Sequence, residues 1–281
     1  MKKLILVISS IMILNNYVVY AATTIFPCYF ELNANKTKNN YITGSFLVSC
    51  EKDEYMHFRI YPAFFEYDRK GKFIKLEDKG QKNSLVKHIR FYPSEFTCKN
   101  GLSQRIRFTI TDLKSLPVGE SKLVLFLEDV NSKKIIIRKI NGEIKSKIII
   151  KAEVGIPIYV DKGNYTKHGI LNSVSIKRID DEYACEYKIS STGNSRISYK
   201  GDGYLFKDNK LIKQFEVPYS TVENEKFLEK IQKLDIPKNG IKDNKEYKIK
   251  LILTYKDEYE QEKILEKEVI FNPEKIPNNK I

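Results

Sequence analysis

The stretch from His88 to Leu127, HIRFYPSEFTCKNGLSQRIRFTITDLKSLPVGESKLVLFL, decides the fold of this chain. From Gln104 to Thr111, the apolar residues Ile106, Phe108 and Ile110 alternate with Arg105, Arg107 and Thr109. Successive side chains of a β-strand point to opposite faces, so this alternation predicts a strand with one buried face and one solvated face. We expect it to lie inside an antiparallel sheet.

Turn residues separate this strand from its neighbours. Asn100-Gly101 comes just before it, and both residues tolerate the positive φ of a tight turn. Pro93 interrupts the apolar segment that precedes the turn, and Leu116-Pro117 leads into a second apolar strand at Leu123 to Leu127. The stretch therefore predicts consecutive strands joined by short turns.

Segments of this kind fill the first half of the chain. We predict strands at Tyr29 to Leu32, Ile42 to Cys50, Tyr55 to Phe65, Lys87 to Tyr92, Gln104 to Thr111, Ser121 to Glu128 and Lys147 to Val160. Short strands at this spacing are typical of an immunoglobulin-like sandwich. Before the last strand, a Lys-rich connection at 130–146 that contains Asn141-Gly142 predicts a mobile hairpin.

The second half repeats the pattern after a polar, turn-rich segment at 161–165. We predict further strands at Gly169 to Lys177, Tyr183 to Ser190, Ser195 to Tyr199, Leu205 to Phe215, Glu246 to Tyr255 and Lys263 to Phe271. The fold class is therefore all-β, with two immunoglobulin-like β-sandwich domains in tandem at 23–160 and 161–281. At Ser220 to Leu234 a capping box and apolar residues at helical spacing leave a short helix and a further strand equally open.

Residues 1–22 are typical of a secretory signal peptide. Lys2 and Lys3 precede an apolar run from Leu4 to Leu14, and Ala21-Ala22 supplies the small residues of a cleavage site. The alternative is an uncleaved anchor, but the run is shorter than the ~20 apolar residues that a membrane span needs. We therefore expect an exported protein that is not inserted in a membrane after signal cleavage.

Side chains suited to catalysis are scarce in this sequence. The chain has only three histidines, His57, His88 and His168, and we interpret each as structural. It contains no nucleophile elbow, His-Glu-x-x-His pair, phosphate-binding loop or paired-cysteine metal spacing. We expect no enzyme activity, no cofactor and no metal.

The chain is basic, with a formal net charge of +13. Its lysines are spread along the whole sequence beside Asp and Glu, and they form no dense block interleaved with aromatic residues. This distribution favours solvated strand faces over a nucleic-acid site.

Several motifs follow one another in the first half in a fixed order. They are Tyr92-Pro93, Phe96, Asn100-Gly101, Gln104-x-Ile106-Arg107 and Leu116-Pro117. This order resembles the first domain of periplasmic pilus-assembly chaperones, whose pattern has Pro-Gly where this chain has Asn100-Gly101. The resemblance implies a boomerang of two sandwiches in the periplasm. It also implies that pilus or fimbrial subunits are partners and that an outer-membrane usher is a further candidate partner.

In the resembled family the last strand of the first domain is lent to an incomplete subunit. The resemblance places this strand between the Lys-rich hairpin and Ile156-Pro157-Ile158. Ile144, Ile148 and Ile150 share one parity there and would enter the subunit. The alternative is that they complete their own domain's core. Ile148-Ile149-Ile150 is apolar on both faces, which favours lending slightly.

The family also holds the subunit's terminal carboxylate with two basic residues. Lys36 is the best match to the first of them. The second is a lysine shortly before the aromatic end of the lent strand, and this chain has none there, because Lys147 and Lys151 come too early and Glu153 is acidic. The way in which the carboxylate would be held therefore stays open.

Four cysteines in an exported chain suggest at least one disulfide. If the strands ending at Cys50 and beginning at Gln104 pair as in the resembled fold, Cys50 and Cys98 come within bridging range. Cys28 to Cys50 is the competing pair, and we favour Cys50 to Cys98 only slightly. Cys185 shares a strand face with apolar residues and is interpreted as a buried thiol.

Our leading hypothesis from the sequence is a periplasmic chaperone that binds and stabilises fimbrial or pilus subunits by donating a β-strand. The alternative is a structural or adhesive surface protein built of two β-sandwiches. The sequence names neither the subunit nor the oligomeric state.

Overall fold

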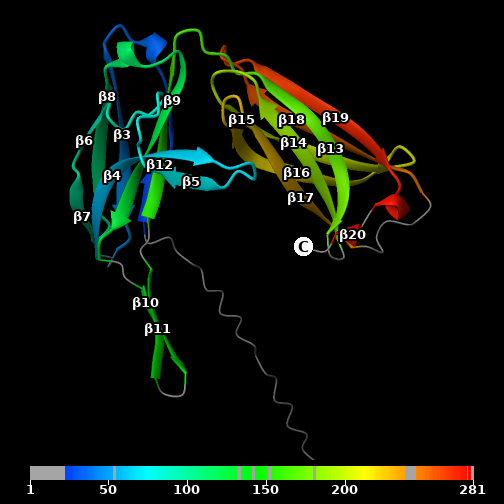
Figure 1. The fold of residues 1–281 in the computed structure, drawn as a ribbon, viewed down its shortest axis with the longest axis horizontal. Coiled ribbons are helices and arrows are strands. Elements are labelled where there is room, and N and C mark those ends of the chain that lie inside the picture. Colours follow the sequence, from blue (N-terminus) through cyan, green and yellow to red (C-terminus); the bar gives the residue numbers. More distant parts are fainter. Residues whose placement is uncertain are drawn as a thin grey trace, which may run out of the picture.

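The computed structural model describes residues 23–52, 55–131, 134–140, 143–150, 153–179, 182–237, 245–276 and 278–279, with side chains outside 132–152 and 277–281. The predicted signal peptide at 1–22 lies outside the described residues. The described chain is all-β and forms two sandwiches and a separate hairpin (Figure 1). The predicted fold class is confirmed.

Two sheets make up the first sandwich. One sheet has the order β1(Thr23–Phe26), β3(Tyr41–Cys50), β8(Ser103–Thr111) and β6(Ile89–Tyr92). The other has the order β2(Phe30–Asn33), β12(Glu153–Lys162), β9(Gly119–Asp129), β4(Tyr55–Tyr67) and β5(Phe73–Leu76), with β7(Glu95–Lys99) also paired to β4. Short 3₁₀ turns lie at η1(Ala34–Lys36) and η2(Leu113–Ser115).

The alternation that opened the sequence analysis becomes the centre of the first core. Ile106, Phe108 and Ile110 of β8 are buried between the two sheets, whereas Arg105 and Arg107 are exposed. The turn before β8 also follows the prediction. Asn100 and Gly101 both have positive φ, and the Leu102 N–H donates to the Lys99 carbonyl at 3.0 Å.

The second sandwich also has two sheets. One has the order β17(Phe227–Pro237), β14(Glu182–Ser191), β13(Gly169–Ile179) and β20(Asn278–Asn279). The other has the order β16(Lys210–Val222), β15(Ile197–Lys207), β18(Tyr247–Lys256) and β19(Glu262–Phe271), and the 3₁₀ turn η4(Pro273–Lys275) follows it. Cys185 is buried in this core, and burial raises the pKa of its thiol to about 12.

The helix considered at Ser220 to Leu234 is not formed. Glu225, with φ of 57°, turns the chain between β16 and β17. In β17 the residues Leu228, Leu234 and Ile236 point into the core at even positions. The period of two that buries these side chains prevails over the helical spacing, and the Glu223 carboxylate binds lysines instead of capping a helix.

The two sandwiches form an angle, as the resemblance implied, and meet near the end of β12 (Figure 1). β12 extends to Lys162, beyond the boundary predicted after 160, and β13 begins at Gly169. Between them Asn35 and Gly163 exchange two hydrogen bonds of 2.8 and 2.9 Å. These bonds attach the start of the connection between β12 and β13 to the first sandwich.

A disulfide joins Cys50 to Cys98, with a Cα–Cα distance of 5.8 Å. This is the pairing that the sequence analysis favoured, and Cys28 is a free, exposed cysteine. Cys50 ends β3 in one sheet, and Cys98 lies in β7, which pairs with β4 of the other sheet. The bond therefore links the two sheets of the first sandwich.

Replacing both Cys50 and Cys98 by alanine is expected to lower the free energy of unfolding of the first sandwich by about 4 kcal/mol. The bond closes a loop with a sequence separation of 48, and the chain-entropy model gives this magnitude. Urea denaturation of the oxidised protein and the variant measures the difference. A loss below about 1 kcal/mol would contradict the expectation, and the Cys28→Ala variant is the matched control.

Candidate functional site: the β12 edge and the cleft between the sandwiches

β12 is paired along only part of one edge. On one side it pairs with β9 over its whole length, from Glu153 to Lys162. On the other side β2 pairs with it only from Ile158 to Asp161. Among the described residues nothing is paired to that edge at Glu153–Pro157. The backbone there has free hydrogen-bonding groups that an added strand can use.

One face of β12 passes from the core out to solvent. Ile156, Ile158 and Val160 are fully buried between the two sheets. Val154 has the same parity but is 47% exposed. The buried face of the strand therefore continues beyond the sandwich as an exposed apolar face.

The beginning of β12 is held by polar contacts on its opposite face. The Tyr61 hydroxyl donates to Glu153 at 2.7 Å, and the Lys75 ammonium lies 3.2 Å from the other Glu153 oxygen. Lys75 also lies 4.5 Å from the centroid of the Phe126 ring. Because β4, β5 and β9 supply these partners, the open edge starts from a fixed position.

The antiparallel hairpin β10(Lys134–Ile140) and β11(Glu143–Ile150) projects away from the first sandwich (Figure 1). Its second strand extends past the Lys-rich connection predicted at 130–146, so that the strand predicted at Lys147 to Val160 is shared between β11 and β12. The predicted turn residues Asn141-Gly142 lie outside the described residues. The register pairs Ile148 with Ile136, but it shifts between Arg138 and Lys139, so that Ile144 pairs with Lys139.

This shift changes the expectation that Ile144, Ile148 and Ile150 share one face of the strand. A bulge inserts one extra residue, and residues on either side of it no longer follow simple alternation. Ile148 and Ile150 keep a common register, whereas Ile144 is separated from them. Only the backbone of β11 is described, so the side-chain role of all three residues stays a prediction.

Lys36 lies in η1, after the end of β2, and is exposed. The uncovered part of β12 begins at the other end of β2, beside Phe30. The structure therefore does not bring Lys36 to the open edge. The residue that adjoins the edge is Tyr29, which is half exposed.

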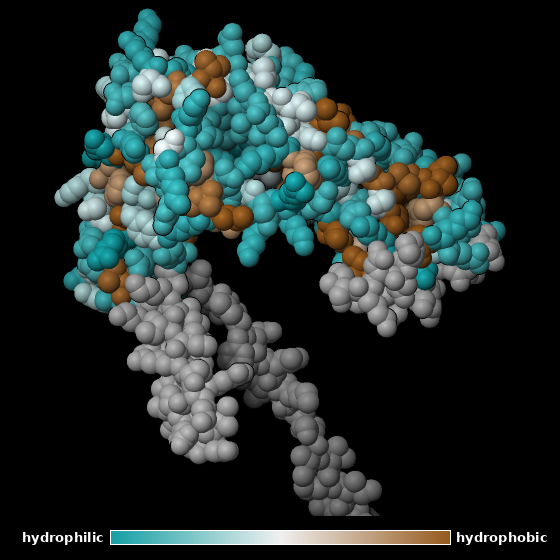
Figure 2. Space-filling view, in the orientation of Figure 1, coloured by the Kyte–Doolittle hydropathy of each residue, from teal (hydrophilic) through white to brown (hydrophobic). Residues whose placement is uncertain are grey.

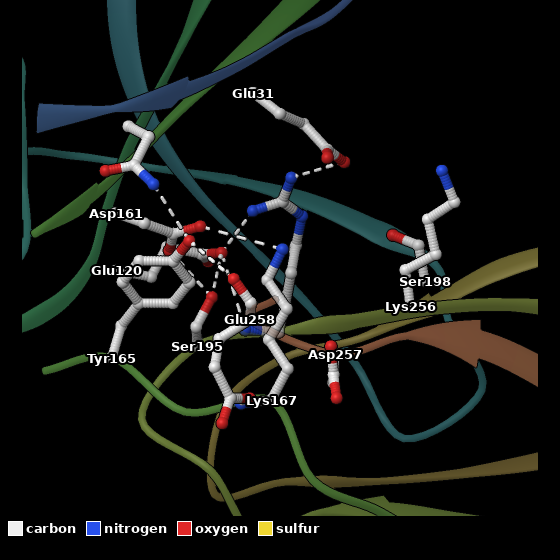
Figure 3. Close-up of polar contacts among 12 residues, drawn as sticks. Glu31, Glu120, Asp161, Tyr165, Lys167, Ser195, Ser198, Lys256, Asp257 and Glu258 are labelled. Atoms are coloured by element: carbon white, nitrogen blue, oxygen red, sulfur yellow. Dashed lines mark hydrogen bonds and ion pairs between the residues drawn. The ribbon is translucent and has the colours of Figure 1, made fainter. Parts of the chain in front are cut away.

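A buried cluster of charged residues joins the second sandwich to the first, close to β2 (Figure 3). Arg196, which precedes β15, lies 2.6 Å from Glu31 of β2 and also contacts Glu120 of β9. Its guanidinium carbon stacks 3.4 Å from the centroid of the Tyr159 ring. One arginine of the second sandwich thus binds three strands of the first.

Asp161 extends the cluster. It accepts a hydrogen bond of 2.7 Å from the Ser195 hydroxyl and lies 3.7 Å from the Lys167 ammonium. Burial raises the pKa of the Glu120 carboxyl, while Arg196 opposes this shift. Both carboxylates are buried, so their stability as ions depends on the cations of the second sandwich.

A second set of charged contacts lies beside this cluster, two residues further along β9. Lys122 of β9 is buried and contacts Glu223, which also binds Lys226 at 2.8 Å. Lys226 reaches back to Glu66 of the first sandwich at 2.8 Å. The turn after β4 adds a hydrogen bond of 2.8 Å from the Glu229 N–H to the Arg69 carbonyl. Two adjacent sets of contacts therefore join the two sandwiches.

Between the sandwiches lies a cavity of about 430 Å³. Tyr29 and Glu31 of the first sandwich line it on one side, and Lys200, Tyr219 and Lys256 of the second line it on the other. On the face in view, mainly hydrophilic residues cover the junction (Figure 2). Tyr29, which comes just before β2, is among the lining residues, whereas no residue of β12 is.

Within the part of the chain that the structure describes, no group of three or more His, Cys, Asp or Glu residues could hold a metal ion. No helix of the described residues is long and apolar enough to cross a membrane. His57 contacts Thr97 at 3.1 Å, and His168 contacts Thr192 at 2.7 Å. Each of these two histidines thus bonds a threonine side chain.

The sequence analysis missed Arg196 and Lys122. Each pairs with a carboxylate that is distant in the chain, Arg196 with Glu120 at a separation of 76 residues and Lys122 with Glu223 at 101. No local pattern marks such a pair. A weak signal was available in Lys122, which comes directly before the apolar run at Leu123 to Leu127, because a buried strand rarely tolerates an unpaired charge.

No protein-family model and no curated protein matches this chain. Among solved structures it is similar to fimbrial chaperones. The class 5 fimbriae chaperone CfaA is 16% identical, covers 87% of this chain and 98% of its own, and has a TM-score of 0.42. CupB2 of Pseudomonas aeruginosa is 9% identical, with 87% and 98% covered and a TM-score of 0.41.

The E. coli chaperone DraB is 12% identical, covers 87% of this chain and 95% of its own, and has a TM-score of 0.41. The similarity to these three structures is low in sequence identity and in TM-score. It is a likeness of fold, and the function proposed below rests on the geometry of this chain.

Proposed function

We propose that this protein is an exported chaperone that binds pilus or fimbrial subunits by donating a β-strand. No chemical reaction is involved. The observation that carries the proposal is the uncovered edge of β12 at Glu153–Pro157, next to the exposed Val154. Natural proteins usually cover or charge such an edge, so an open edge with an apolar face favours a function in pairing.

Strand addition accounts for the shape of this region. Backbone hydrogen bonds to β12 provide affinity, and alternate side chains of the donated strand enter a groove in the client. In this proposal Val154, Ile150 and Ile148 form one apolar face, which extends from β12 along β11 of the hairpin. We leave Ile144 out of that face, because the register shift separates it from Ile148 and Ile150.

A client strand on this edge would continue the line of β2 and end against Tyr29, which lines the cavity. Lys200 lines that cavity and forms no ion pair among the described residues. We place the terminal carboxylate of the client near Lys200, in place of the predicted Lys36. The proposal retains the periplasm as location and the signal peptide at 1–22. It keeps two domains but moves the boundary predicted after 160 to the segment between Lys162, the end of β12, and Gly169, the start of β13.

Replacing Val154 by Asp tests the proposal at a described side chain. Burying a valine contributes about 1.5 kcal/mol, so losing this contact and burying a charge should weaken client binding at least about tenfold. Subunits that co-purify with the tagged protein from its own host measure the effect. The matched control is Ile270→Asp, an exposed apolar residue of β19.

The variant should keep the wild-type circular dichroism spectrum, because Val154 is half exposed. Equal client recovery with Val154→Asp and with wild type would overturn strand donation at this edge. Incorporation of the protein itself into surface fibres would instead favour the structural or adhesive role.

A further inference from the structure

Three arginines lie on the outward face of the β1-β3-β8-β6 sheet, opposite its buried core. Arg105 and Arg107 of β8 alternate with buried residues and are exposed. Arg90 of β6 is also exposed, and the register places Tyr92 of the same strand directly opposite Arg107. The three cations therefore share one continuous surface with an aromatic residue.

This surface contains no acidic residue. At the outward positions of the four strands the residue types are Arg, Tyr, Phe, Leu, Ser and Thr. None of the three arginines forms an ion pair within the described chain; Arg105 donates only to the Ser45 hydroxyl, at 3.1 Å. By contrast, Lys248 and Lys250 on β18 pair with Glu268 and Glu266 across the strand.

Large exposed side chains accompany the arginines. Tyr92 is 80% exposed, Phe26 of β1 74% and Tyr41 of β3 50%. Tyrosine and arginine are enriched among the residues that contribute most to binding at protein interfaces. Exposed apolar groups rimmed by polar ones are typical of an interaction surface.

The face is independent of the client edge. The β2-β12-β9-β4-β5 sheet lies between it and the second sandwich (Figure 1). A partner bound to the β8 face would leave Val154 and the cleft accessible. The inference therefore goes beyond the proposed function and does not depend on it.

We propose that this face binds an acidic, aromatic-containing segment of a partner protein. The guanidinium group forms paired hydrogen bonds with a carboxylate, and it is the preferred cation where such planar recognition occurs. The face carries no lysine, although lysine is abundant in the chain. Anionic membranes and nucleic-acid backbones usually attract clusters of lysine and arginine together, so the composition favours a protein partner.

Fluorescence anisotropy with the mature protein tests this assignment. The probe is a labelled synthetic peptide that alternates Asp or Glu with Phe or Leu, with both ends blocked; the comparison peptide replaces every acid by lysine. We expect binding of the acidic peptide alone. The Arg105→Gln/Arg107→Gln variant should weaken it at least about tenfold, and an increase from about 0.05 to about 0.5 M NaCl should weaken wild-type binding.

The control variant is Lys70→Gln/Lys210→Gln, which removes the same charge from exposed residues elsewhere. Arg105→Lys/Arg107→Lys should bind with intermediate affinity, because it keeps the charge but loses the paired hydrogen bonds. No binding of the acidic peptide, or equal weakening by the control variant, would overturn the proposal. Tighter binding to phosphatidylglycerol vesicles or to poly(dT) than to the peptide would overturn it in favour of a membrane or a nucleic acid.

Discussion

The Ile148→Asp/Ile150→Asp variant should lose client binding at least about 100-fold while its sandwiches remain folded. Complete burial of an isoleucine contributes about 1.5–3 kcal/mol, so two lost contacts alone account for this factor. A carboxylate forced into an apolar groove adds a desolvation cost. The residues lie in the projecting hairpin, whose replacement should leave the two cores intact (Figure 1).

Co-purification of subunits and circular dichroism measure the two parts of this prediction. Ile264→Asp/Ile270→Asp, which changes two exposed isoleucines of β19, is the matched control. Wild-type client recovery with the hairpin variant would show that the hairpin is not donated. A separate Ile144→Asp variant should bind the client normally, because the register shift separates Ile144 from the other two.

Replacing Arg196 by Ala should lower the free energy of unfolding by about 3–5 kcal/mol, the usual cost of leaving a buried charge without its partner. Glu120 would lose its contact with Arg196, and Glu31 would lose its pair across the junction. Urea denaturation at pH 7 measures the loss. A cost below about 1 kcal/mol would contradict the structural role of this cluster.

The pH dependence distinguishes this cause from simple loss of packing. Burial raises the pKa of Glu120, so the folded protein binds the proton more tightly than the unfolded chain. Stability from this group is therefore largest below the unfolded pKa and falls as the pH rises through the folded pKa. The loss of unfolding free energy in Arg196→Ala, relative to wild type, should therefore become smaller from pH 7 toward pH 4. In the Arg196→Ala/Glu120→Leu variant the carboxyl is absent, so its part of this pH dependence should disappear.

The fold was predictable because local alternation and core packing agree. The period of two in Gln104 to Thr111 places Ile106 and Phe108 in the core, and nothing in the structure opposes it. At Ser220 to Leu234 both a helical and a strand period were present, and no local feature favoured the strand. Tertiary packing selects the strand over the helix there, because Leu228 and Leu234 are both buried on the same face of β17.

The candidate site was less accessible to sequence reasoning. The resemblance to pilus-assembly chaperones predicted which segment is lent. The register shift beside Lys139 could not be predicted, because it depends on how β10 and β11 pair. The angle between the sandwiches depends on Arg196 and Lys122, whose partners are distant in the chain. A strand pattern specifies which side chains are buried in a sheet, and it carries no information on charges that meet across domains.

The most direct test of the central claim is photo-crosslinking through a probe at position 148 of the mature protein in its own host, followed by mass spectrometry. The account predicts a bond from this position to small exported subunits, whereas a probe at position 270 should capture none. A monomer free of crosslinks at position 148, in cells that produce such subunits, would contradict strand donation.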